Sequence, residues 1–372
     1  MFIGAVCEAG NAGMDPGACG LWHTVGMVDF LSRARGALVG LAVGDALGTT
    51  NEFQPAGSFE PITGMVGGGV FDLEPGQWTD DTSMALCLAD SLLAQGRYDS
   101  FDVMERYERW YSEGYRSSTG VCFDIGNQVS RALWDFRANP RVPVDAVRTT
   151  SAGNGAIMRL APVVIAGFEA RDPHEIVATA GLSARETHFS AEAEAATEVF
   201  AALLVGALLG WAPERIVDVA WASTGAAFDD VAARVINADP TERASWEADT
   251  SGYIVNGLRL AVHGLLDFPS FKDATLAIAN MGGDSDTNAA IYGQLGGAFF
   301  GVEAIPASWR NALYEGEQID ALARALVELR LEAPLTRFDE DLQGEAPPSD
   351  RHPPRRDGRA RGATQPPPLA SD

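Results

Sequence analysis

Apolar residues recur at helical spacing along most of this chain, and no stretch alternates strictly between apolar and polar residues as a half-buried strand would. The segment after Asp81 shows the pattern clearly, because Met84, Leu88 and Leu92 follow one another at intervals that place them on one face of a helix. Further helices are expected over residues 190–210, 255–266, 271–280, 287–300 and 319–332, with Ser190 as an N-cap. We therefore predict a compact all-α domain of about a dozen helices.

A helix predicted over residues 32–47 contains glycine at every fourth position, namely Gly36, Gly40 and Gly44. Glycine lowers helix propensity by roughly 1 kcal/mol relative to alanine, so its repetition on one face requires a reason. The expected reason is the close approach of another backbone, which makes this helix central. Small residues also crowd positions 289–297 and predict equally tight packing there.

Three segments lack a helical pattern. Residues 1–29 are rich in glycine, and residues 341–372 are rich in proline and arginine, so we predict a disordered extension and a disordered tail around a domain over residues 30–340. Residues 54–77 form a long glycine-rich stretch inside that domain, and long loops of this kind are usually functional or disordered. We expect residues 54–77 to form a mobile lid.

The composition excludes several classes of partner. A net charge of -24 argues against nucleic acid or an anionic membrane as the principal partner. The longest apolar stretch, residues 199–211, is shorter than the roughly 18 residues that a spanning helix needs. The four cysteines include no CxxC pair and predict no disulfide framework, so a cytoplasmic location is the default. The sequence does not determine the oligomeric state, for which a monomer is the default.

Two short acidic clusters, far apart in the sequence, carry the most informative chemistry. Each combines closely spaced carboxylates with a threonine hydroxyl just before a predicted helix. Such hard oxygen ligands suit Mg²⁺ or Mn²⁺ rather than zinc. The alternative is that each cluster is only a helix N-cap, but two sets of neighbouring aspartates would repel one another without a cation. The candidate metal ligands are Thr79, Asp80, Asp81, Asp284, Asp286 and Thr287.

Several segments together resemble the ADP-ribosylglycohydrolase family, closest to its bacterial branch that includes the dinitrogenase reductase-activating glycohydrolase. The matching segments are residues 44–48 with Glu52 and Phe53, 78–84, 117–127, 153–159, 187–188, 251–253 and 282–287, in the family's order. The resemblance spans about residues 30–335. It implies a compact all-α fold with a central cleft that holds two divalent cations, Mg²⁺ or Mn²⁺, and a substrate that carries ADP-ribose.

The resemblance also implies roles for individual residues. The six candidate ligands match the family's metal ligands, and Glu52 matches an acidic residue beside the metals that acts as a gate or a general base. Without the motif, Glu52 would read as a surface glutamate. The residues implied as catalytic are Glu52, Asp80 and Asp286.

The implied substrate contacts come from four loops. The expected contacts are Asp124, Asn127, Gly153, Asn154, Gly155, His188 and Tyr253. The loop of residues 153–155, called the glycine loop below, is expected to hold diphosphate through backbone N–H groups. His188 is expected to donate to phosphate or ribose, although a lone histidine is more often structural.

Two of these contacts keep explicit alternatives. Tyr253 has two equal interpretations, adenine stacking and core packing. Asp124 would pair with a guanidinium, which favours arginine-linked ADP-ribose, or would cap the helix that follows it.

The function implied is metal-dependent hydrolysis of the N-glycosidic bond that joins ADP-ribose to a modified protein side chain, with arginine first. The alternatives are serine-linked ADP-ribose, O-acetyl-ADP-ribose or a modified nucleic-acid base as substrate, a two-metal phosphohydrolase, and a non-catalytic ADP-ribose-binding or immunity protein. The fold alone does not choose among them.

Overall fold

A computed structural model describes residues 28–141, 152–236 and 249–330 of the chain. The disordered ends predicted for residues 1–29 and 341–372 lie outside these ranges, except for Val28 and Asp29. Asp29 caps the first helix, because its side chain accepts a hydrogen bond from the backbone N–H of Ser32.

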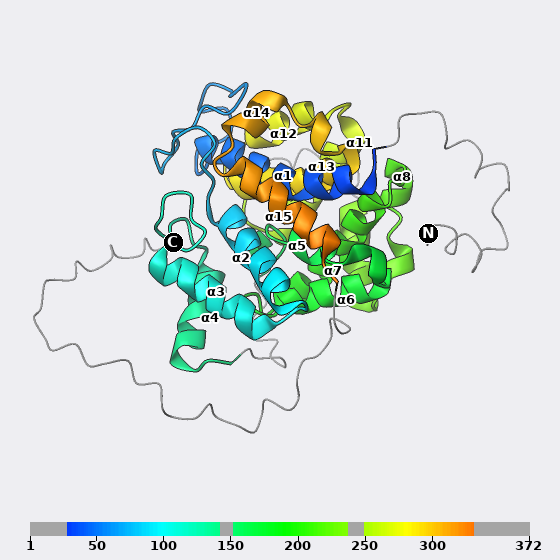
Figure 1. The fold of residues 1–372 in the computed structure, drawn as a ribbon. Helices are drawn as coiled ribbons and strands as arrows, with labels where there is room; N and C mark the ends of the chain where they lie inside the picture. The colour runs from blue at the N-terminus through cyan, green and yellow to red at the C-terminus, as the bar shows by residue number, and fades with distance from the viewer. Residues whose placement is uncertain (1–27, 142–151, 237–248, 331–372) are drawn as a thin grey trace, which may run out of the picture. The chain divides into compact units, whose positions relative to one another are not determined.

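Within the described residues every regular element is a helix, which confirms the all-α prediction (Figure 1). The α-helices are α1 (Phe30–Gly48), α2 (Asp80–Gln95), α3 (Ser100–Glu113), α4 (Asn127–Ala138), α5 (Ala161–Ile165), α6 (Pro173–Ala184), α7 (Ala191–Leu208), α8 (Pro213–Ile216), α9 (Ala226–Ile236), α11 (Ile254–Asp267), α12 (Phe271–Ala279), α13 (Ser285–Phe300), α14 (Ala307–Ala312) and α15 (Gly316–Glu328). In this part of the chain extended backbone pairs only at two isolated bridges, Gly68 with Leu73 and Gly153 with Tyr253. No helix here is both long and apolar enough to span a bilayer.

Helix α1 packs against α13 along its glycine face, as its four-residue glycine spacing predicts (Figure 1). A Cβ atom added at Gly36 would lie 2.1 Å from the carbonyl oxygen of Gly297, and one at Gly40 would lie 2.2 Å from that of Gly293. Only glycine permits this approach. The buried faces of both helices therefore form the centre of the core, and their site-bearing ends, the C-terminus of α1 and the N-terminus of α13, lie together.

The predicted helices are present, with shifts of a few residues at their ends. Ser190 caps α7 as expected, since its hydroxyl accepts from the N–H of Ala193. The helix predicted over residues 319–332 begins earlier, at Gly316, and ends at Glu328. Both cysteines within the described ranges, Cys87 and Cys122, are free.

The glycine-rich segment over residues 54–77 contains no helix and is fastened near its middle. Asn280 donates from its side-chain amide to the Ile62 carbonyl oxygen (3.0 Å) and accepts from the Ile62 N–H (2.8 Å). The Thr50 hydroxyl donates to the Gly67 carbonyl oxygen (3.1 Å). That this segment is a mobile lid stays a prediction. The hydrogen bonds at Ile62 and Gly67 restrict any such movement to the parts of the segment on either side of these two residues.

Candidate metal centre and active site

The two acidic clusters meet where the C-terminus of α1 and the N-termini of α2 and α13 converge. Thr79 directly precedes α2 and Asp284 directly precedes α13, yet neither side chain caps its own helix. The interpretation of the clusters as simple N-caps is therefore wrong. Their side chains turn instead toward one another.

A buried aspartate of α1, Asp45, caps α2 from outside. Its Oδ1 accepts from the N–H of Thr79 (2.8 Å) and lies 2.9 Å from the Thr79 hydroxyl, while its Oδ2 accepts from the N–H (3.0 Å) and the hydroxyl (2.6 Å) of Thr82. The carboxylate thus satisfies N–H groups at the start of α2 that have no partner within the helix. Sequence reasoning did not assign Asp45 a role, although it lies in one of the matching motifs.

The carboxylates form two overlapping groups. Oxygen atoms of Asp45, Asp81 and Asp286 lie within 4.8 Å of one another, and so do oxygen atoms of Glu52, Asp124 and Asp286. Asp286 belongs to both groups. The structure therefore gathers residues from three helix ends and two loops around one side chain.

The two threonine hydroxyls lie among the same oxygens. Thr79 Oγ1 is 3.2 Å from Asp286 Oδ2 and 3.3 Å from Asp81 Oδ2, and Thr287 Oγ1 is 3.4 Å from Asp81 Oδ2. Asp284 reaches the cluster edge, where the side-chain amide of Asn154 donates to its Oδ2 (2.5 Å). Asp80 is buried beside these groups. All six predicted metal ligands are thus close together.

Burial raises the pKa of every carboxyl group in the cluster, and repulsion between carboxylates adds to the shift for all of them except Asp45 and Asp284. Burial, followed by the charges of Asp286 and Asp284, raises the pKa of Glu52 to about 11. Burial, followed by Asp284 and Asp45, raises the pKa of Asp286 to about 7. For Asp81 burial and the Asp45 charge raise the pKa well above its usual value. No ion pair among the described residues supplies a Lys or Arg to these groups.

Two buried oxygens in the cluster, Asp81 Oδ1 and Glu52 Oε2, have no hydrogen-bond partner within the described part of the chain. Unpaired buried carboxylate oxygens are costly unless a proton or a cation satisfies them. The donor set consists of oxygen alone, which fits Mg²⁺ or Mn²⁺. By contrast, both oxygens of Asp45 already accept two donors each, so Asp45 fits a supporting position better than a ligand position.

Glu52 and Asp124 face the cluster from two loops. Glu52 is only 3% exposed, so its interpretation as a surface glutamate is wrong. Asp124 hydrogen-bonds Asp286, and it does not cap α4, whose N-cap position is Gly126. The backbone of Asp124 has φ +57°, a left-handed conformation that is uncommon for residues other than glycine but that aspartate tolerates.

The glycine loop uses two of its backbone N–H groups within the protein. Gly153 already donates its N–H to the side-chain oxygen of Gln128 (3.1 Å), and Asn154 donates its N–H to the Gly252 carbonyl oxygen (2.9 Å). The N–H groups of Gly153 and Asn154 are therefore already satisfied, and the expectation that the loop holds diphosphate through backbone N–H groups stays a prediction. Tertiary partners that the sequence does not reveal occupy them, and Gly155 alone keeps that possibility.

His188 packs against the same loop, because a Cβ atom at Gly155 would lie 2.9 Å from its ring. A buried guanidinium group organises this corner: Arg159 donates to the Gly155 carbonyl oxygen (2.6 Å) and to the Thr187 hydroxyl (2.7 Å). The Thr187 hydroxyl is also 2.8 Å from His188 Nδ1. Burial, followed by the Arg159 charge, lowers the pKa of His188 to about 3, so the ring is neutral. Since Thr187 accepts from Arg159, its own proton is directed to Nδ1, which leaves the His188 proton on Nε2.

The last two predicted contacts are less closely tied to the cluster. The Tyr253 hydroxyl donates to Glu192 (2.8 Å) and accepts from Arg234 (2.9 Å), and its ring packs on the core, which favours the packing interpretation. Asn127 begins α4 and is exposed. Its neighbour Gln128 makes the contact to the glycine loop instead.

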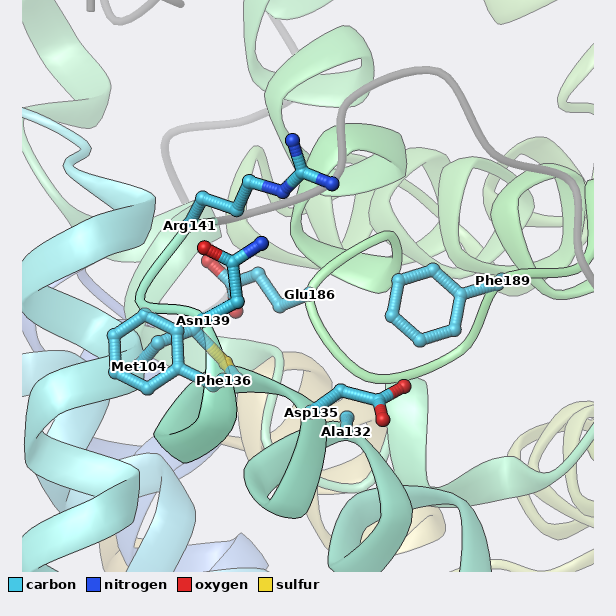
Figure 2. A pocket seen from close by; sticks show the side chains of 8 residues that line it. All are labelled: Met104, Ala132, Asp135, Phe136, Asn139, Arg141, Glu186 and Phe189. Carbon is cyan, nitrogen blue, oxygen red and sulfur yellow. The ribbon is translucent and has the colours of Figure 1, made fainter.

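A separate pocket of about 200 Å³ lies among residues of α3, α4 and the segment before α7 (Figure 2). Its lining includes Phe136, Asn139, Arg141 and the buried Glu186, and none of the predicted site residues. Glu186 accepts a short hydrogen bond from the Tyr98 hydroxyl, and burial raises its pKa to about 7. This pocket is therefore distinct from the carboxylate cluster.

A family model described as ADP-ribosylglycohydrolase matches residues 27–334. The chain belongs to the ADP-ribosylglycohydrolase family. It is 38% identical over 297 residues to the ADP-ribosylarginine hydrolase Tri1 of Serratia proteamaculans, a match that covers 80% of this chain and 79% of that protein. It is 33% identical over 301 residues to the ADP-ribosyl-dinitrogen-reductase glycohydrolase of Rhodospirillum rubrum, covering 78% and 95%. A solved structure titled ADP-ribosylglycohydrolase-related protein complex matches with a TM-score of 0.69 and 38% identity, over 81% of this chain and 99% of that one.

Proposed function

We propose that this protein is a metal-dependent hydrolase that removes ADP-ribose from modified arginine side chains of proteins. Two facts support the choice of arginine. The relatives that are 38% identical carry that activity in their name, and Asp124 places a carboxylate among the cluster oxygens, where it suits a guanidinium group. Cytoplasmic location stays a prediction from the cysteine content.

The observation that carries the proposal is the buried set of carboxylate and hydroxyl oxygens gathered around Asp286. Such an all-oxygen set suits divalent cations, and we propose two of them, Mg²⁺ or Mn²⁺. The residues that would hold them are Thr79, Asp80, Asp81, Asp284, Asp286 and Thr287. When bound, such cations supply positive charge that fixes the ribose hydroxyl groups and polarises water.

The reaction itself breaks the bond between the anomeric carbon of ribose and a guanidinium nitrogen. A water oxygen forms the new bond to that carbon, and one water proton goes to Glu52, whose carboxylate form the positive charge of bound cations would favour. The leaving guanidine recovers a proton, so the products are ADP-ribose and an unmodified arginine side chain. Glu52 is buried and positioned beside Asp286 for this exchange. Nearby carboxylates stabilise the oxocarbenium character of the transition state.

Other residues of the chain bind and orient the substrate. Asp124 would pair with the guanidinium of the leaving group, and the His188 Nε2–H would donate to a phosphate or ribose oxygen. Asn154 acts through Asp284, which its side-chain amide holds in place.

The test is incubation of the purified protein with arginine-linked and serine-linked ADP-ribosylated peptides, with Mn²⁺ or Mg²⁺ and after exhaustive chelation. We expect intact ADP-ribose from the arginine-linked peptide, only when a divalent cation is present. The Asp286→Asn variant should lose on the order of a hundredfold or more in turnover. Release of AMP would instead identify a phosphohydrolase, and full activity after chelation would contradict the proposal.

A further inference from the structure

Three aromatic side chains from separate segments meet beside the carboxylate cluster. The rings of Phe53 and Phe71 are 6.4 Å apart at 74°, and those of Phe71 and Phe123 are 5.1 Å apart at 62°. Phe53 directly follows Glu52 and Phe123 directly precedes Asp124, so two of the rings flank carboxylates of the candidate active site. We call Phe53, Phe71 and Phe123, with Val70 and Val121, the aromatic rim.

Three members of the aromatic rim are exposed to solvent, and the rings of Phe71 and Phe123 are half-buried. Phe53 is 62% exposed, and Val70 and Val121 are each 61% exposed, whereas Glu52 next to them is buried. The backbone of Phe53 has φ +58°, a left-handed conformation that is strained for a bulky residue. Clustered exposed apolar side chains around a polar site are typical of interaction surfaces.

The charge around the rim identifies the kind of partner. Residues 36–96 contain no Lys or Arg, and the loop that carries Val70 and Phe71 exposes Glu60, Asp72 and Glu74. An apolar surface edged by carboxylates complements a polypeptide that carries basic and apolar side chains. A second copy of this chain is a poor partner, because its net charge of -24 would repel the same acidic loop.

We propose that the aromatic rim binds the polypeptide on either side of the modified arginine in the substrate protein. This inference rests on the proposed function, since the position of Asp124 at the leaving guanidinium is what sets Phe123 beside the polypeptide. The rim thus contributes to recognition of the protein, and the cluster to recognition of ADP-ribose.

The experiment compares two substrates of the same enzyme: a protein ADP-ribosylated on arginine, and the small molecule ADP-ribosyl-arginine. The variants are Phe53→Asn, because Asn tolerates positive φ, and Val70→Asn. The matched control is Leu209→Asn at the end of α7, where the native leucine is 47% exposed and lies outside the rim.

We expect the rim variants to lose about tenfold more kcat/KM on the protein than on the small substrate, the size of loss that follows truncation of a hot-spot side chain in an interface. The control should show no such difference. Added salt should lower kcat/KM for the ADP-ribosylated protein more than for ADP-ribosyl-arginine, because salt screens the exposed carboxylates at the edge of the rim. Equal losses on both substrates would mean that the rim serves ADP-ribose itself, and no loss on either would mean that it is unused; both overturn the inference. If the unaltered enzyme releases ADP-ribose from neither substrate, the proposed function fails instead.

Discussion

Replacement of Asp45 by asparagine should separate the positioning of the cluster from its charge. The amide keeps the size of the carboxylate but has one oxygen instead of two. Whichever way the amide faces, its NH₂ group meets the N–H and hydroxyl of either Thr79 or Thr82, which in the native protein donate to the carboxylate oxygens at 2.6–3.0 Å. The start of α2 therefore loses up to two buried hydrogen bonds to a charged acceptor.

The magnitude follows from two opposing effects. Each lost hydrogen bond to a charged group contributes about 1.5–3 kcal/mol, so the free energy of unfolding should fall by roughly 3–6 kcal/mol. The loss of one negative charge beside Asp81 and Asp286 offsets part of this without a cation. With saturating Mn²⁺ the offset disappears. The Asp45→Asn variant should thus be destabilised more in Mn²⁺ than in chelator, and turnover should fall about 10–100-fold.

The assay is denaturant unfolding in Mn²⁺ and in chelator, together with the rate of ADP-ribose release. The control is Asp90→Asn on α2, which disrupts the paired hydrogen bonds from Arg116 (both 2.7 Å) away from the cluster. That variant should lose stability equally in both conditions. If Asp45→Asn unfolds like the unaltered protein in Mn²⁺ and keeps its turnover, Asp45 does not position α2.

Three further predictions use other parts of the structure. Glu186→Gln should flatten the pH dependence of stability. Because burial raises the folded-state pKa of Glu186 to about 7, the free energy of unfolding of the native protein falls by up to about 3 kcal/mol as pH rises from about 4.5 to 7. Denaturation at several pH values should show that the variant lacks this fall. Thr187→Val should raise KM for the ADP-ribosylated substrate about tenfold, since the His188 proton is no longer held on Nε2; steady-state kinetics with unchanged KM would contradict it. Gly48→Ala and Gly36→Ala should each cost about 1–3 kcal/mol or more in thermal or denaturant unfolding, but only Gly48→Ala should also abolish stabilisation by Mn²⁺.

The features of this structure that could be predicted from the sequence are those that depend on local sequence patterns. Helical periodicity predicted the all-α fold, and glycine at every fourth position predicted the close approach of another backbone, which the structure identifies as that of α13. Carboxylate and hydroxyl chemistry predicted which residues of the two clusters would gather. These patterns depend on the residue and its near neighbours, so a single sequence contains them.

The remaining features depend on partners far away in the chain. Asp45 lies in an apolar helix, and only the fold shows that its carboxylate accepts hydrogen bonds from N–H groups at the start of another helix. The N–H groups of Gly153 and Asn154 looked free because their acceptors, Gln128 and Gly252, belong to other segments. Tertiary hydrogen bonds of this kind have no local signature.

The glycine face of α1 and the metal-binding chemistry are parts of one arrangement. A Cβ atom at Gly48 would lie 2.4 Å from the Cα atom of Asp286, whereas one at Gly36 would meet Gly297, about 18 Å away along the helix at 1.5 Å per residue. The same contact that brings the two backbones together thus sets the distance between Asp45 on α1 and Asp286 on α13. Clustered carboxylates repel one another and would push these helix ends apart in the absence of cations. The close-packed glycine face opposes that repulsion with a rigid backbone contact, which helps to keep the cluster oxygens within 4.8 Å of one another.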